Sequence, residues 1–108
     1  MSLEKTIYLN QLLSYYGSLL TDRQLSMMQS YYEEDLSLSE IADYYEISRQ
    51  AVHDILKRSE KLLESYEEKL RILAKSNDRL KHLKEIRSMV ADQDDILEKI
   101  DYLIQLES

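Results

Sequence analysis

Residues 37–58 (SLSEIADYYEISRQAVHDILKR) constrain the fold more than any other segment, because their spacing is typical of a helix-turn-helix. Ala42 stands where two helices pass so closely that only a small side chain fits. Ile47 follows in the turn, and Val52 and Ile55 close the core from the second helix. We therefore predict two short helices at a fixed angle, with the second free to lie in the major groove of DNA.

Capping residues mark the start of both helices. Ser37 and Glu40 form a capping box at the first helix, and Ser48 is placed to cap the second. Glu46 occupies the turn position where such motifs usually carry glycine, because the backbone there tends to need a positive φ. A non-glycine residue in that region costs about 1 kcal/mol, which a buried core offsets, so the prediction of the motif stands.

The composition favours an all-α protein. The chain has one Gly and no Pro, Cys, Trp or Phe, so it is nearly free of residues that break helices. The absence of cysteine fits a reducing compartment, and no apolar run approaches the ~20 residues of a membrane span. The first ten residues also lack the layout of a signal peptide. We therefore expect a cytoplasmic protein with no membrane insertion.

The spacing of apolar residues predicts six helices in two parts. The first helix covers residues 3–20, and the second begins at the capping box Thr21–Gln24. The fourth helix continues beyond the motif, because apolar residues recur in heptads, and we expect it to end near Ala74. The predicted architecture is a helix-turn-helix core of four helices with a long fourth helix, residues 1–74, followed by a C-terminal helical hairpin, residues 75–108.

Two amphipathic stretches separated by polar breaks predict the C-terminal hairpin. The breaks fall at residues 75–78 and 92–95. Each stretch has an apolar face that a two-helix hairpin cannot bury well by itself. That face must pack on the far half of the long fourth helix, on a second copy of the chain, or on another protein. We expect a homodimer, and the alternative is a monomer whose hairpin folds back on its own fourth helix.

Charge is distributed unevenly along this acidic chain, whose net charge is −7. Residues 1–47 hold 8 acids and 2 bases, residues 48–91 hold 7 acids and 11 bases, and residues 92–108 hold 6 acids and 1 base. The positive excess therefore begins at the second motif helix, as expected of a face that binds a polyanion. The alternative is a solvated helix surface of mixed charge.

The solvent side of the second motif helix carries the candidate contacts to DNA or RNA. Arg49 can bridge two acceptors of guanine, and Gln50 can pair with adenine. The basic residues of the following turns suit phosphates. The alternative is that these side chains pair with acids of the chain itself, such as Arg49 with Glu46 or Glu40. The complete predicted set is Ser48, Arg49, Gln50, His53, Lys57, Arg58 and Lys61.

Nothing in the sequence favours an enzyme. The chain has two histidines, His53 and His82, no cysteine and no glycine-rich phosphate loop. Asp92, Asp94 and Asp95 resemble part of a calcium loop but lack its central glycine and its final glutamate. We expect no catalytic residues, no metal, no cofactor and no small-molecule substrate.

Residues 4–71 resemble the YlxM-like family of small bacterial proteins, most strongly through SRQAV and the basic, leucine-bearing helix that follows it. The motif is also similar to region 4 of sigma factors, which reads an upstream promoter element. This resemblance places base contacts on Arg49, Gln50, His53 and Lys57. It implies a regulatory or accessory role beside the signal recognition particle, whose GTPase is usually encoded next to family members. The rival hypothesis is an adaptor, in which the motif is a scaffold and the acidic ends bind a basic partner such as that GTPase.

Overall fold

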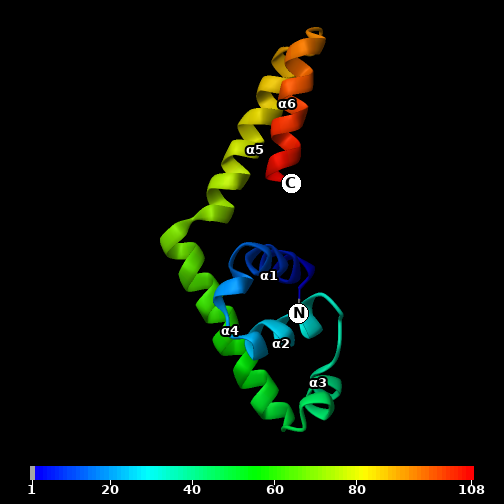
Figure 1. The fold of residues 1–108 in the computed structure, drawn as a ribbon, viewed down its shortest axis with the longest axis vertical. Helices are drawn as coiled ribbons and strands as arrows, with labels where there is room; N and C mark the ends of the chain where they lie inside the picture. The colour runs from blue at the N-terminus through cyan, green and yellow to red at the C-terminus, as the bar shows by residue number, and fades with distance from the viewer. Residues whose placement is uncertain (1) are drawn as a thin grey trace. The chain divides into compact units, whose positions relative to one another are not determined.

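The computed structural model describes residues 2–108, and the regular elements in that range are all helical, which confirms the all-α prediction. In chain order they are α1 (Leu3–Tyr16), the 3-10 helix η1 (Gly17–Leu19), α2 (Asp22–Tyr32), α3 (Leu38–Tyr45), α4 (Arg49–Leu70), α5 (Ile72–Met89) and α6 (Asp94–Glu107) (Figure 1). The chain divides between Leu70 and Arg71 into two compact units. Within residues 2–108, no helix is long and apolar enough to cross a lipid bilayer.

In the first unit, α1, α2 and α3 each pack against α4 (Figure 1). The core joins leucines of α1 and methionines of α2 to apolar side chains of α3 and α4. Burial of apolar surface contributes roughly 25 cal/mol per Å², so this shared core is the main force that holds α4 in position. The most deeply buried hydrophobic side chains come from all four helices: Leu9, Leu12, Tyr16, Met27, Met28, Ile41, Val52 and Leu63.

Helices α3 and α4 form the predicted helix-turn-helix. Ala42 and Val52 are buried where the two helices meet, as the spacing predicted. Ile47 in the turn and Ile55 on α4 are only half-buried. The motif therefore packs through its small residue and one face of α4, with the two isoleucines at the border of the core.

The turn between α3 and α4 has the left-handed backbone that its sequence predicted. Glu46 lies at φ 58° and ψ 44°, and its N–H donates to carbonyls of the last turn of α3. The N–H of Ile47 donates to the carbonyl of Ala42 at 3.1 Å. These bonds close the C-terminal end of α3, although a side chain in the left-handed region is strained.

The first helix is shorter than the predicted range of 3–20. Helix α1 ends at Tyr16, and the chain tightens into a 3-10 turn that begins at Gly17. A Cβ at Gly17 would lie 3.0 Å from Cδ1 of Leu25, so the glycine permits a close approach to α2. The turn departs from the period of an α-helix, and Leu19 within it is exposed.

The fourth helix also ends before the predicted Ala74. Arg71 adopts a left-handed conformation, with φ 55°, which separates α4 from α5. The polar break predicted at residues 75–78 is wrong, since these residues lie inside α5. Ser76 is buried there, and its hydroxyl donates to the carboxylate of Glu107 on α6. A polar side chain that finds its partner on a neighbouring helix does not compete for the backbone of its own helix.

The second unit is a hairpin of α5 and α6, which run antiparallel beside each other (Figure 1). Leu73 on α5 and Ile100 on α6 are buried. Two ion pairs cross the hairpin, Arg79–Glu107 at 2.7 Å and Arg87–Asp101 at 2.6 Å. Part of the apolar face remains exposed, as the sequence predicted, and it includes Ile86, Leu103 and Leu106.

Candidate nucleic-acid interface

The exposed side of α4 carries the residues predicted to contact nucleic acid. Val52 and Leu56 are buried on the opposite side and fix the rotation of the helix. Ser48 precedes the helix as its cap, because its Oγ accepts a hydrogen bond of 3.0 Å from the N–H of Ala51. The other predicted side chains are all exposed on α4: Arg49, Gln50, His53, Lys57, Arg58 and Lys61.

Asp54 binds two of the predicted contact residues along the helix. Its Oδ1 accepts a hydrogen bond of 2.9 Å from Nε2 of Gln50. The same oxygen lies 3.5 Å from Nδ1 of His53, which makes an ion pair only when the imidazole is protonated. Gln50 must therefore exchange its bond to Asp54 for a bond to a base if it reads adenine.

Among the described residues, Arg49 forms no ion pair with Glu40 or Glu46, the two acids that the sequence suggested as its alternative partners. Glu40 instead completes a capping box with Ser37, whose N–H donates to Oε1 of Glu40 at 3.0 Å. These bonds hold the pKa of Glu40 below its usual value, because they favour the charged carboxylate. Within residues 2–108, no ion pair joins Arg49 to Glu46. The guanidinium group is therefore open to solvent in the first turn of α4.

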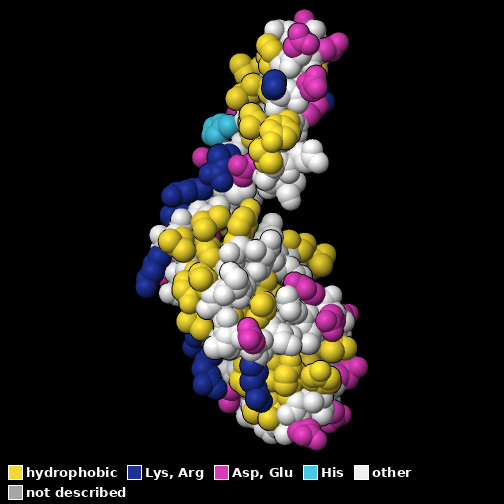
Figure 2. Space-filling model, in the orientation of Figure 1, with side chains coloured by type: hydrophobic (Ala, Val, Ile, Leu, Met, Phe, Trp, Pro, Cys, Tyr) yellow, Lys and Arg dark blue, Asp and Glu magenta, His cyan; other side chains and the backbone are white. Residues whose placement is uncertain are grey.

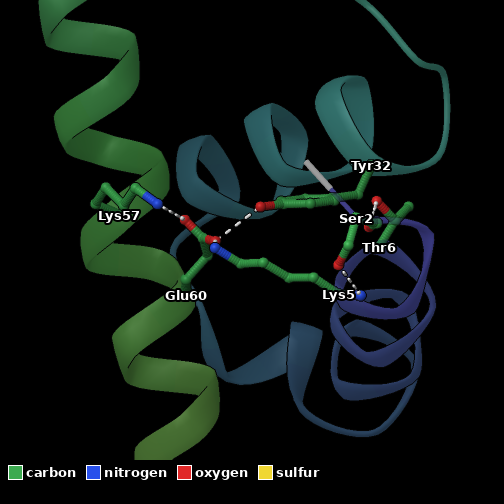
Figure 3. A network of polar contacts seen from close by, with 6 residues as sticks. All are labelled: Ser2, Lys5, Thr6, Tyr32, Lys57 and Glu60. Carbon is green, nitrogen blue, oxygen red and sulfur yellow. Dashed lines mark hydrogen bonds and ion pairs between the residues drawn. The ribbon is translucent and has the colours of Figure 1, made fainter.

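Lys57 meets a buried acid on its own helix (Figure 3). Glu60 is almost entirely buried, and its Oε2 lies 3.8 Å from Nζ of Lys57. Its Oε1 accepts a hydrogen bond of 2.7 Å from the hydroxyl of Tyr32 on α2. The same Oε1 lies 3.4 Å from Nζ of Lys5 on α1. One carboxylate therefore links the exposed side of α4 to both of the helices behind it.

Burial and the contacts with Glu60 determine the charge states of Tyr32 and Lys5. Burial, followed by the hydrogen bond to Glu60, raises the pKa of Tyr32, because both disfavour the phenolate. The negative charge of Glu60 raises the pKa of Lys5 above its usual value. Tyr32 therefore remains a neutral donor at neutral pH, and Lys5 carries a full positive charge.

Lys5 is a basic residue of this surface that the sequence did not identify. With His53 and Lys57 it lines a hollow of about 320 Å³, whose other walls are Tyr31, Tyr32, Leu38, Leu56 and Glu60. The two lysines are far apart in the sequence, and the segment around Lys5 is acidic overall. Only the packing of α1 on α4 brings Lys5 beside the predicted contacts.

Charges of opposite sign occupy different sides of the first unit. Figure 2 shows Lys and Arg mainly along the edge formed by α4, while Asp and Glu gather across from it. Exposed acids lie on and around α3, at Glu33, Glu34, Asp35, Glu40, Asp43 and Glu46. A polyanion would therefore be attracted to α4 and repelled by the α3 side.

Comparisons with known proteins agree with the helix-turn-helix formed by α3 and α4. A family model described as "Putative helix-turn-helix protein, YlxM / p13 like" matches residues 3–103. The UPF0122 protein YlxM of Bacillus subtilis (strain 168) is 48% identical over 110 residues, which cover 99% of this chain and 100% of that relative. A UPF0122 protein of Bacillus pumilus (strain SAFR-032) is 54% identical over 92 residues, which cover 85% of this chain and 84% of that relative.

Proposed function

The chain belongs to the YlxM/p13-like helix-turn-helix family, and on that basis we propose that it is a non-enzymatic protein that binds DNA or RNA through α4. The observation that carries the proposal is the basic, exposed side of a helix whose other side is locked in the core. A rigidly held helix presents its side chains to a groove without a large entropic cost.

The proposed contacts divide into base readers and phosphate contacts. Arg49 is the main base reader, because its guanidinium can make two hydrogen bonds to guanine. Gln50 and His53 read neighbouring positions once a base displaces Asp54. The phosphate contacts are Ser48, Lys57, Arg58 and Lys61.

A double substitution tests this assignment. Arg49→Ala with Lys57→Ala should weaken binding to a fluorescent mixed-sequence 20-base-pair duplex or to an RNA of matched length. Each lost phosphate contact lowers the slope of log K against log salt by about 0.9. The matched control is Lys69→Ala with Lys99→Ala, which removes the same charge from exposed positions outside the proposed contacts. Equal binding by both double variants and the wild type at several salt concentrations would contradict the proposal.

A second candidate function is an adaptor that binds a basic protein. The acidic side around α3 and the net charge of −5 over residues 92–108 favour this candidate. A pull-down from the native cell separates the two functions. A protein partner that stays bound after nuclease treatment but dissociates in ~0.5 M salt supports the adaptor, because salt screens the attraction between surface charges. Loss of all captured material after nuclease supports the nucleic-acid reader.

The same pull-down tests the pathway. The family resemblance implies a role beside the signal recognition particle, and we propose this pathway as the setting of either function. Enrichment of the particle's RNA would favour the reader, and enrichment of its GTPase after nuclease treatment would favour the adaptor. If neither the RNA nor the GTPase is captured, the result contradicts the proposed link to the signal recognition particle.

We further propose that the hairpin joins two copies of the chain. A groove of about 370 Å³ lies between α5 and α6, and its apolar lining is Leu83, Ile86, Leu103 and Leu106. Apart from the side chains that already pair across the hairpin, α5 holds one more base than acids and α6 holds two more acids than bases. A second copy related by a twofold axis can place its acidic α6 against the basic α5, so both the charges and the apolar faces are matched.

A further inference from the structure

We propose that Lys5 and Lys57 together hold one backbone phosphate of the bound nucleic acid, and that Glu60 fixes the positions of both lysines. This inference rests on the proposed function and adds to it a contact from the N-terminal helix. The phosphate would lie at the mouth of the hollow lined by these lysines and His53.

The geometry places two ammonium groups on opposite sides of one carboxylate. Figure 3 shows Lys57 and Lys5 approaching Glu60 from the two sides. The distances are 3.8 Å from Lys57 and 3.4 Å from Lys5, each to a different oxygen of Glu60. An ammonium group has three donors, so each lysine keeps donors for an incoming anion. The cluster of two lysines and one glutamate has a net positive charge.

Burial separates the roles of the three side chains. The side chain of Glu60 is only 6% exposed, whereas those of Lys5 and Lys57 are 42% and 49% exposed. The hydroxyl of Tyr32 also binds the carboxylate from inside the molecule. An anion arriving from solvent therefore meets the two ammonium groups first, while Glu60 remains beneath them as an anchor. Glu60 is a positioning residue and makes no contact with the phosphate.

A phosphate held in this way would set the register of α4 in the groove. Contacts to phosphates fix the orientation of a protein on nucleic acid, while contacts to bases specify the sequence. Lys57 lies one turn beyond His53 on α4, and Lys5 reaches the same place from α1. The phosphate would therefore be bound by two helices, which fixes the orientation of the protein in the groove.

Salt titrations of binding test the shared phosphate. We would compare Lys5→Gln, Lys57→Gln and the double variant with the wild type, using the same 20-base-pair duplex. Because both lysines share one phosphate, the double variant should lower the slope of log K against log salt by about 0.9. Two separate phosphates would lower it by about 1.8. The control, Lys69→Gln, removes an exposed charge from the last turn of α4 and should leave the slope close to that of the wild type.

Each outcome decides one question. Lys5→Gln should bind the duplex more weakly than Lys69→Gln at the same salt concentration, although its slope changes little because Lys57 still neutralises the phosphate. If these two variants bind equally tightly while the wild type binds, the inference is overturned and the proposed function stands. A slope change near 1.8 in the double variant also overturns the shared phosphate. If the wild type binds neither DNA nor RNA, the proposed function itself fails, and the inference fails with it.

A conservative variant separates charge from folding. Lys5→Arg keeps the positive charge beside Glu60 and should retain the wild-type slope. Far-ultraviolet circular dichroism of every variant checks that the helices remain formed. Loss of binding by a fully helical Lys5→Arg to the level of Lys5→Gln would contradict a role based on the charge of Lys5.

Discussion

Tyr32 donates a hydrogen bond of 2.7 Å to Glu60, and this bond joins the end of α2 to the middle of α4. Both side chains are buried. A carboxylate removed from water in this way needs its partners, because an unpaired buried charge is costly. The stability of the first unit and the placement of Lys57 therefore depend on the same polar contact.

Tyr32→Phe should lower the free energy of unfolding of the first unit by about 1.5–3 kcal/mol, the usual contribution of a hydrogen bond to a charged group. Urea unfolding followed by circular dichroism measures the change. Tyr31→Phe is the matched control, because Tyr31 is the adjacent ring and only half-buried. Equal free energies of unfolding for the two variants would show that the bond to Glu60 contributes nothing.

Glu46→Gly should stabilise the first unit by about 1 kcal/mol. The residue adopts φ 58°, where a Cβ is strained and glycine is not. Glu46→Ala keeps the Cβ and removes the charge, so it should not reproduce the gain. Thermal unfolding of both variants checks the prediction, and a destabilised glycine variant would contradict it.

The stability of the hairpin should fall in acid. The hydrogen bond from Arg79, followed by that from Ser76, holds the pKa of Glu107 below its usual value of 4.5. The folded hairpin therefore binds this proton less tightly than the unfolded chain does. The stabilisation by Glu107 is fully present above the pKa that this carboxyl has in the unfolded chain. It is lost as the pH falls through the lower pKa that the carboxyl has in the folded hairpin.

Amide hydrogen exchange and urea unfolding, followed at α5 and α6 between pH 3 and pH 6, measure this effect. Glu107→Gln should depend less on pH than the wild type over that range. An identical pH dependence in the two proteins would contradict the assignment to Glu107.

A charged side chain introduced into the groove between α5 and α6 should dissociate the proposed dimer. Leu106 lines the groove between α5 and α6, and its side chain is 65% exposed, so Leu106→Asp should not unfold the hairpin. Sedimentation equilibrium should show a dimer for the wild type and a monomer for this variant. Tyr102→Asp is the control, because Tyr102 on the same helix is 60% exposed and lies outside the groove. A wild-type protein that is monomeric at all concentrations would rule out the second copy as the occupant.

The failed prediction of the end of α4 has a clear physical cause. The heptad spacing continues through Leu73, and no glycine or proline stands at Arg71, so local rules gave no reason to end the helix. The chain nevertheless takes a left-handed turn at Arg71 and starts α5. The serine that suggested a break, Ser76, instead serves the contact between α5 and α6.

The sequence by itself determined the helix-turn-helix, its caps and the strained turn at Glu46, because each depends on residues within a few positions of one another. It also determined which side of α4 faces solvent, since that follows from the helical period of Val52 and Leu56. Only the tertiary structure decided that Glu60 is buried and that Lys5 stands beside Lys57. A carboxylate on a helix is expected to be solvated. Burial of Glu60 is favourable only because partners from distant helices replace its lost hydration: Tyr32 supplies a hydrogen bond and Lys5 supplies a positive charge.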